Sequence, residues 1–227
     1  MKSKIIKNNL GNILEQFKTK NVVFDIIDSG ESGSIKYVDS AKIMDSRRLK
    51  KVKMDERMIA KYLDDFKNNL VKQPIYCLIH DDNLEVLIGR KRLAAAQRLK
   101  AKIGVITLRF KSDYEAVLFQ IADIIDRKTQ NVMEVATLFD ILKKEYQYTQ
   151  RDISLLTALS RSQVANILRL LSLPQAIQDE ISENNLSFGH AKVLVNHDEV
   201  DLKSLVARIK SDKISVHDLE RIIYEKP

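Results

Sequence analysis

The sequence changes character near residues 128–131. Before this point, short β-branched runs typical of strands alternate with apolar residues at helical spacing. After it, the helical spacing continues alone, and no flexible linker marks the change. We therefore expect an α+β N-terminal domain over residues 34–128, followed by an all-α domain over residues 129–227. Residues 1–33 are polar and basic and are expected to form an N-terminal tail.

The strand-forming runs of the first half lie next to turn-forming residues. Val22–Ile27 and Ile35–Val38 are separated by the Gly- and Ser-containing stretch 28–33, which favours a hairpin. Asp55 is a suitable N-cap, and Gly89 a suitable turn residue, for the helices that follow them. Further strands are expected at 75–79, 84–88 and 105–110, and helices at 56–68, 91–100 and 112–127.

Positive charge is concentrated in the N-terminal quarter. The net charge is +7, and residues 1–53 alone hold twelve Lys or Arg against six Asp or Glu. Six of these basic residues lie within residues 42–53, where we expect an extended basic loop. Such an excess suits a polyanionic partner such as nucleic acid, because it strengthens the attraction to phosphate. A solvated lysine-rich tail is the alternative interpretation.

Composition excludes several classes of protein. Cys77 is the single cysteine, so the chain has neither an intramolecular disulfide framework nor a cysteine-based zinc site. The four histidines are scattered and indicate no metal site. No apolar run approaches the roughly 18 residues of a membrane span, and the first residues do not form a signal-peptide core. We therefore expect a cytoplasmic protein without membrane association.

Residues 149–171 hold two helix-start signals a short distance apart. Thr149 and Ser160 are both good N-caps. The apolar residues after each cap predict a short helix over 150–157 and a second helix over 161–171. Two short helices joined by a tight turn predict a helix-turn-helix, which places its second helix in the major groove of DNA.

The turn between the two helices falls on Ala158 and Leu159. Alanine stands where glycine is frequent, and the turn tolerates it if the φ angle of Ala158 stays negative. Many helical bundles also contain two short helices and a tight turn. The local pattern alone therefore leaves open a second interpretation, in which this is one more polar-faced helix of a bundle.

The second helix divides into an apolar and a polar face. Its apolar side chains recur at helical spacing and would anchor the helix in the core. Its polar side chains could reach base edges, where Gln and Asn pair bidentately with adenine, and Arg binds guanine or phosphate. The apolar face consists of Val164, Ile167, Leu168 and Leu171, and the polar face of Ser162, Gln163, Asn166 and Arg169.

From about residue 34 onward, the chain resembles the ParB family of chromosome and plasmid partition proteins. The similarity to the family's helix-turn-helix includes Ser-Arg-Ser-Gln-Val-Ala-Asn at 160–166. The order and spacing of five blocks carry the resemblance. These blocks are VKQPIYC (71–77), GRKRLAAA (89–96), TQRDISLLTALSRSQVANILRLLSLP (149–174), LSFGHAKVLV (186–195) and ISVHDLERII (214–223).

The resemblance implies a role in DNA partition. ParB proteins bind a centromere-like inverted repeat, parS, and work with a Walker-type ParA ATPase. Two copies of a helix-turn-helix read an inverted repeat, so a nucleoid-associated homodimer is implied. For His190, a packing or capping role is an equal alternative to a DNA contact. The matching positions imply DNA contacts from Arg161, Ser162, Gln163, Asn166 and Arg169, with additions from Gly189, His190 and Lys192.

The N-terminal tail offers a candidate contact for the ATPase. NNLGNIL (8–14) is loosely similar to the Gly-Leu-containing basic peptide with which ParB proteins touch ParA. Lys2, Lys4 and Lys7 would supply the positive charge. A tail that binds no partner is the alternative interpretation.

Many ParB proteins bind CTP with Mg²⁺ and hydrolyse it slowly, forming a clamp that slides along DNA. This sequence departs from the first nucleotide motif: Gly89 and Arg92 remain, whereas Arg90, Lys91 and Ala94 replace a Glu and two Arg. The three cations at a helix start still suit a polyphosphate or the DNA backbone. A solvated basic helix start is the alternative interpretation.

The second nucleotide motif also departs from the family. Asp123, Ile124 and Arg127 stand where the family has Glu, Asn and Arg. Asp123 could still approach Mg²⁺, but the apolar Ile124 cannot replace an amide ligand. CTP binding and a weak CTPase activity therefore stay open. The candidate nucleotide- or phosphate-binding residues are Gly89, Arg90, Lys91, Arg92, Asp123 and Arg127.

Other functions could use the same scaffold. A transcription regulator or a nucleoid-occlusion protein would differ only in the DNA site that it binds. An enzyme built on the ParB-like domain belongs to a different class. Sulfiredoxin-like chemistry would need a cysteine in the phosphate loop, and positions 89–96 contain none. Cys77 lies in an expected strand and fits there as a small buried hydrophobe.

Overall fold

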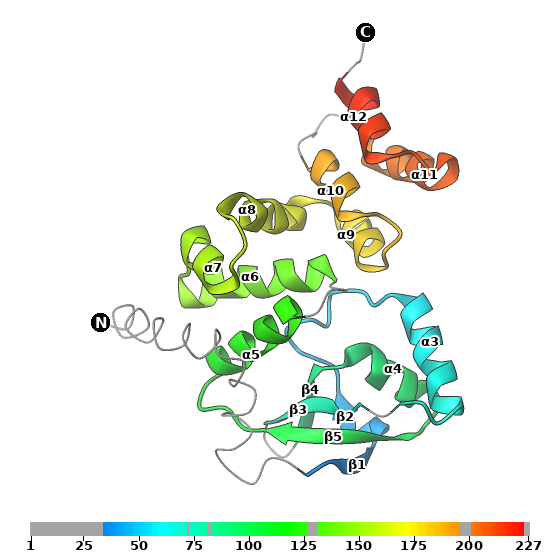
Figure 1. Cartoon of the computed structure of the whole chain (residues 1–227), viewed down its shortest axis with the longest axis vertical. Coiled ribbons are helices and arrows are strands. Elements are labelled where there is room, and N and C mark those ends of the chain that lie inside the picture. The colour runs from blue at the N-terminus through cyan, green and yellow to red at the C-terminus, as the bar shows by residue number, and fades with distance from the viewer. Residues whose placement is uncertain (1–33, 72, 81–82, 127–130, 196–200, 225–227) are drawn as a thin grey trace.

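The computed structural model describes residues 34–71, 73–80, 83–126, 131–195 and 201–224 (Figure 1). In these ranges a mixed region of strands and helices precedes a region of helices only, which confirms the expected fold class. The mixed region contains the strands β1 (Lys36–Asp39), β2 (Ile43–Met44), β3 (Ile75–His80), β4 (Asn83–Ile88) and β5 (Lys102–Leu108), and the helices α3 (Glu56–Lys67), α4 (Arg90–Arg98) and α5 (Asp113–Asp126).

The five strands form one sheet in the order β1-β5-β3-β4-β2. The pairs β1–β5 and β3–β4 are antiparallel, and the pairs β3–β5 and β2–β4 are parallel. The run Ile35–Val38 contributes most of β1 as predicted, and β1 pairs with β5, so that Lys36 lies opposite Val105. Its expected hairpin partner, Val22–Ile27, lies outside the described residues.

The sheet has two apolar faces, because successive side chains along a strand point to opposite sides. Cys77 of β3 belongs to one core, to which α4 contributes Leu93 and Ala96. Leu78, the next residue of β3, belongs to the other core with Phe119 of α5. The helices α4 and α5 therefore cover opposite faces of the sheet, and the single residue Gly89 connects β4 to α4.

The second region stacks its helices above the sheet in Figure 1. The helix expected over 161–171 ends two residues early, at Arg169, and a 3-10 turn over Leu170–Ser172 follows it. None of the helices in the described ranges has the length and apolar character to cross a membrane. The helices are α6 (Val132–Tyr146), α7 (Gln150–Thr157), α8 (Arg161–Arg169), α9 (Gln175–Ser182), α10 (Phe188–Leu194), α11 (Leu202–Asp212) and α12 (Val216–Tyr224).

The largest core joins the two regions. The loop after β2 contributes Leu49 and Val52, and α5 contributes Val117 and Ile121. The same cluster continues through buried residues of the helices α6 to α12. The expected domain boundary at residues 128–129 is thus bridged by one continuous core, and a division at that point remains a prediction.

Candidate nucleic-acid interface and phosphate cavity

Reciprocal hydrogen bonds fix both helix starts of the helix-turn-helix. At α7 the Thr149 hydroxyl accepts from the Asp152 backbone N–H (3.1 Å), and the Asp152 carboxylate accepts from the Thr149 N–H (2.9 Å). At α8 the Ser160 hydroxyl accepts from the Gln163 N–H (3.2 Å), and the Gln163 amide oxygen accepts from the Ser160 N–H (2.8 Å). Both predicted N-caps are confirmed. The capping role of Gln163 was missed, although the spacing Ser-x-x-Gln is its sequence signature.

The turn between α7 and α8 is more strained than the sequence analysis assumed. Ala158 adopts a φ of 56°, in the left-handed region, so the condition under which the turn would tolerate alanine without strain is not met. The reason is that α7 ends at Thr157 and the cap of α8 is already at Ser160, which leaves two residues to reverse the chain. The Ser154 hydroxyl holds the turn by donating to the Leu159 carbonyl (2.6 Å). The left-handed conformation costs alanine about 1 kcal/mol relative to glycine.

The helix α8 presents its polar residues on one side and its apolar residues on the other. Val164 and Ile167 are buried and anchor the helix in the large core. The Arg169 guanidinium donates to the Asn166 amide oxygen (2.8 Å), which links two turns of the polar side. The structure therefore brings together the five candidate DNA contacts of this helix. Arg161, Ser162, Gln163 and Arg169 are exposed, and Asn166 is half-buried.

His190 on α10 has both ring nitrogens engaged within the chain. Its Nδ1 atom lies 2.6 Å from the Ser187 hydroxyl, and its Nε2 atom lies 2.9 Å from the Ile214 carbonyl oxygen. Ser187 also caps α10 by accepting from the His190 backbone N–H (3.2 Å). Because the imidazole ties α10 to the segment before α12, the packing and capping role fits His190 better than a DNA contact.

The two other candidates on α10 differ from each other. A Cβ atom on Gly189 would lie 2.9 Å from the Val216 Cγ2 atom, so glycine permits the close approach of α10 and α12. Its role is therefore explained by packing. Lys192, by contrast, is exposed and keeps its predicted place as a cation beside the helix-turn-helix.

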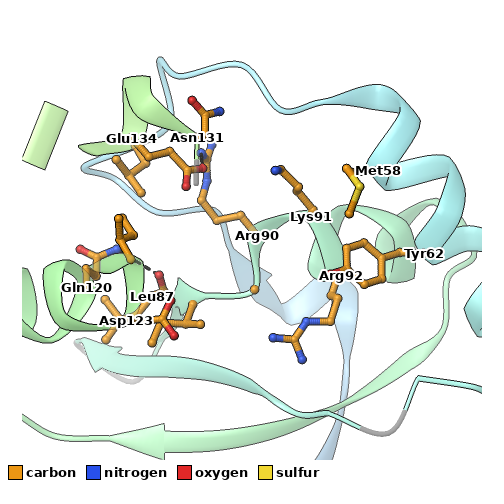
Figure 2. Close-up of a pocket in the computed structure, with 14 residues that line it drawn as sticks. Met58, Tyr62, Leu87, Arg90, Lys91, Arg92, Gln120, Asp123, Asn131 and Glu134 are labelled. Carbon is orange, nitrogen blue, oxygen red and sulfur yellow. Dashed lines mark hydrogen bonds and ion pairs between the residues drawn. The ribbon is translucent and has the colours of Figure 1, made fainter. Parts of the chain in front are cut away.

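A cavity of about 120 Å³ opens where β4 meets α4 (Figure 2). Gly89 forms this junction with a φ of 101°, and a Cβ atom there would lie 2.5 Å from the Ile75 Cγ2 atom. Both the backbone conformation and the available space therefore require glycine. The cavity is lined by α3, the start of α4, α5 and the start of α6, including Met58, Tyr62, Gly89, Arg90, Lys91, Arg92, Gln120, Asp123, Ile124 and Glu134.

Arg90 lines the cavity, and its guanidinium binds two carboxylates. Its Nε and Nη2 atoms each lie 2.8 Å from the Asp45 carboxylate, and its Nη1 atom lies 3.1 Å from Glu134. Its side chain is 4% exposed. Burial raises the pKa of Asp45, but the hydrogen bonds and charge of Arg90 outweigh burial and hold that pKa below its usual value. In this structure the Arg90 guanidinium is therefore paired within the chain, and phosphate binding by Arg90 stays a prediction.

Arg92 is also held inside the chain, whereas Lys91 is not. The Arg92 guanidinium donates to the carbonyl oxygens of Gln73 (2.6 Å) and Pro74 (2.8 Å), so it stabilises the entry into β3. In Figure 2 Lys91 lies beside Met58 of α3, on the cavity side of the helix start. Of the three cations predicted to face a phosphate, Lys91 is the one that remains placed to do so.

The far wall of the cavity comes from α5. Gln120 is buried and donates to the Leu87 carbonyl (3.1 Å), while its own amide oxygen has no hydrogen-bond partner among the described residues. Asp123 and Ile124 also line the cavity, as their motif position implied. Arg127 lies outside the described residues. The wall thus contains a buried acceptor without a hydrogen-bond partner in the described part of the chain, which a single glutamine in an amphipathic helix does not reveal in sequence.

The basic loop after β2 is folded inward, so the expectation of an extended basic loop is wrong. Arg47 donates to the Asp113 carboxylate (2.7 Å), and its backbone N–H donates to the buried Glu85 (2.9 Å). The Arg48 side chain is 7% exposed and lies 3.1 Å from Asp113. The acids that neutralise these arginines are distant in sequence, on β4 and α5. Arg47 stays exposed although it is paired, and Lys50, Lys51 and Lys53 are exposed too.

Comparisons with known proteins identify the family. Residues 128–227 match the family model described as the ParB HTH domain. The chain is 33% identical over 190 residues to a probable chromosome-partitioning protein ParB of Rickettsia prowazekii, an alignment that covers 83% of this chain and 63% of that protein. The chain belongs to the ParB family. A second relative of the same description, from Rickettsia felis, is 30% identical over 193 residues, covering 85% of this chain and 66% of that protein.

The chain spans 63% and 66% of the length of these two ParB relatives. Among solved structures, the C-terminally truncated chromosome-partitioning protein ParB from Caulobacter crescentus, complexed to the centromeric parS site, has a TM-score of 0.45 and 22% identity. That match covers 84% of this chain and 100% of the other.

Arg90 stands where the ParB family has a glutamate in its first nucleotide motif. In this chain Arg90 binds the carboxylates of Asp45 and Glu134, which are 45 and 44 residues away in the sequence. Neither acid is part of the motif by which the site was predicted. An arginine in place of a glutamate implies that an acidic residue elsewhere in the chain neutralises it. The sequence does not say which acidic residue this is.

Proposed function

We propose that this chain is the centromere-binding protein of a ParA/ParB-type chromosome or plasmid partition system. The helix α8 would enter the major groove of an inverted DNA repeat with its polar face toward the base edges. The observation that carries this proposal is α8 itself. Four polar side chains share one face, Arg161 is exposed in the first turn, a capping box and two buried anchors hold the helix, and the segment matches the ParB HTH domain.

The parts of this reading unit would have separate tasks. Arg161, in the first turn of α8, and the amides of Gln163 and Asn166 would contact base edges and set the preferred sequence. Exposed lysines would contact phosphates, which adds affinity for DNA of any sequence and makes binding salt-dependent. The candidates for that second task are Lys50, Lys51, Lys53 and Lys192.

An inverted repeat presents the same half-site twice. We therefore propose that two copies of the chain bind one site as a homodimer, with their α8 helices about one helical turn of DNA apart. A bound complex would be located at the nucleoid. The stoichiometry on a single isolated site tests this: two chains per repeat are expected, and one chain per repeat would contradict it.

The decisive experiment is affinity selection of sheared genomic DNA at near-physiological salt. Wild-type protein is expected to enrich a few inverted repeats sharply. Asn166→Ala is expected to lose that enrichment while retaining recovery of random DNA, because the exposed lysines are unchanged. Uniform recovery of genomic DNA by the wild type would contradict site-specific recognition. If the enriched sites lay at promoters scattered over the genome, the alternative of a transcription regulator on the same scaffold would replace the partition role.

The cavity at Gly89 carries a second proposal, the binding of CTP. The N-terminus of α4 and Lys91 would face the phosphates. Bound Mg²⁺ would neutralise phosphate charge, with Asp123 as the acid at hand. A phosphate near Arg90 would compete with Asp45 and Glu134, so binding would loosen the contact between α4 and α6. Such loosening is a route to a nucleotide-dependent clamp on DNA.

Calorimetry with CTP and Mg²⁺, with GTP as a comparator, tests this second proposal. Binding of CTP that weakens at least tenfold in Lys91→Ala is expected. Arg98→Ala is the matched control, since this cation of α4 is exposed and pairs with Glu56 outside the cavity. Equal affinity for the two nucleotides, or the same loss in both variants, would contradict a CTP site. Hydrolysis is a separate question, which phosphate release would answer.

A ParA-type ATPase is the protein partner that we propose for the basic tail at residues 1–33. The candidate peptide 8–14 with Lys2, Lys4 and Lys7 lies outside the described residues, so this proposal depends on sequence similarity alone. Stimulation of the ATPase by the full chain, lost on replacing these three lysines by alanine, is the expected result. Unchanged stimulation would contradict a role of the tail.

A further inference from the structure

The polar face of α8 has both of its amide oxygens engaged within the chain. The Gln163 oxygen accepts from the Ser160 backbone N–H (2.8 Å) as part of the capping box. The Asn166 oxygen accepts from the Arg169 guanidinium (2.8 Å). Each amide can therefore offer a DNA base its NH₂ group without giving up a bond. Arg161, on the same face, also carries only donors.

Breaking these two internal hydrogen bonds on binding DNA would cost free energy. The Ser160 N–H is one of the donors at a helix start that lack an intrahelical partner, so losing its acceptor would leave it unpaired against the groove. The bond from Arg169 to Asn166 is charge-assisted and stronger than one between neutral groups. A base contact that needed either oxygen would first have to break one of these bonds. A base contact that uses only the NH₂ groups would not.

The four base pairs differ in what they show to such a face. Guanine presents the two acceptors O6 and N7 in the major groove, and thymine presents the acceptor O4. Adenine presents one acceptor and the N6 donor, and cytosine presents the N4 donor. The familiar bidentate pairing of Gln or Asn with adenine uses the amide oxygen to accept from N6. On α8 that oxygen is already bound to the protein.

We propose that α8 reads its half-site through donated hydrogen bonds only, at the O6 and N7 atoms of guanine, the O4 atom of thymine and the N7 atom of adenine. Gln163 and Asn166 then set specificity by their NH₂ groups. This differs from the bidentate pairing with adenine that their residue types predicted. This inference rests on the proposed DNA-binding function and specifies what that function recognises.

The chain allows a nearly isosteric test. Gln163→Glu keeps an oxygen that can cap Ser160, and Asn166→Asp keeps an oxygen that can bind Arg169, but both remove the NH₂ donors. Each variant is expected to lose affinity for the selected repeat about tenfold more than for random DNA of equal length. Random DNA corrects for the added negative charge, which weakens both complexes through the phosphates. Thermal unfolding without DNA is expected to be unchanged, which separates recognition from folding.

Modified bases supply the second readout, with wild-type protein throughout. Replacing guanine in the repeat by 7-deazaguanine removes the N7 acceptor and is expected to weaken binding about tenfold. Inosine is the matched control, because it keeps O6 and N7 and should bind as guanine does. Replacing adenine by purine, which lacks the N6 amino group, should change affinity less than twofold. A large loss with purine and none with 7-deazaguanine would overturn the inference while leaving site-specific binding intact. If no repeat were preferred over random DNA, the proposed function would fail, and the inference with it.

Discussion

The starts of α4 and α8 look alike in sequence but are used in opposite ways. Each helix opens with an arginine that follows a turn, Arg90 after Gly89 and Arg161 after Ser160. Arg161 is exposed on the face proposed to meet DNA. Arg90 is 4% exposed and joins Asp45 to Glu134. A basic residue at a helix start therefore predicts an anion site only when no buried acid from elsewhere in the chain has bound it first.

The largest expected difference between the two helix starts is in stability. Arg90→Ala should lower the free energy of unfolding by about 3 kcal/mol, because it removes a buried guanidinium and leaves the Asp45 and Glu134 carboxylates without their counter-ion. Arg161→Ala should change it by less than about 0.5 kcal/mol, as expected for an exposed side chain. Urea unfolding of both variants measures the contrast. Equal effects would mean that Arg90 does not hold the two regions together.

The glycine before Arg90 offers the next largest effect. Gly89→Ala should destabilise the protein by about 2 to 3 kcal/mol, because the new Cβ atom meets Ile75 and the backbone stays left-handed. The matched substitution is Gly104→Ala in β5, where the nearest side-chain atom would be 3.1 Å away and the φ is not positive. Thermal unfolding should place Gly89→Ala clearly below Gly104→Ala. The reverse order would show that the junction tolerates a side chain.

In the turn of the helix-turn-helix, the reverse substitution of alanine by glycine should raise stability. Ala158→Gly is expected to stabilise the protein by about 0.5 to 1 kcal/mol, since glycine adopts the left-handed conformation without a Cβ penalty. The preference for the selected repeat over random DNA should stay the same, because residue 158 lies outside the polar face of α8. A loss of stability would indicate that φ at this position is negative in solution.

Lowering the pH should weaken the stabilising contact between Arg90 and Asp45 at the start of α4. Arg90 holds the pKa of Asp45 below the usual value of 3.8. The pair therefore contributes its full stability above that pH and loses it as the pH falls through the lowered pKa. Asp45→Asn should be less stable than the wild type at pH 6, and the gap should narrow below about pH 4. The effect is the smallest of the four, because the Asp45 side chain is 40% exposed. A gap that stayed constant down to pH 2 would contradict the linkage.

The sequence predicted the helix-turn-helix well because its determinants are local. The caps Thr149 and Ser160, and the anchors Val164 and Ile167, lie within 19 residues, and the structure confirms each of them. The two faces of α8 follow directly from that spacing. The φ of Ala158, the capping role of Gln163 and the end of α8 at Arg169 did not follow from the sequence analysis. The φ of Ala158 depends on how many residues the end of α7 leaves for the turn.

The cavity was predicted less well because its determinants are distant. The position of Gly89 and the lining by Asp123 followed from motif positions. The inward orientation of Arg90 depends on two acids more than 40 residues away, one on either side of it in the chain. Arg48 is likewise neutralised by Glu85 and Asp113. Long-range pairing of this kind has no periodicity or spacing by which a single sequence would show it.

The core shared between α5 and the later helices limits how this protein can be recombined. A chimaera joined at residue 128 would expose Val117, Leu118 and Ile121 to water, or place them against a surface shaped for another sequence. Such a hybrid would fold poorly even if both halves came from working proteins. The DNA target of this chain is therefore more readily altered by point substitutions on the outer face of α8 than by exchanging whole segments with a relative.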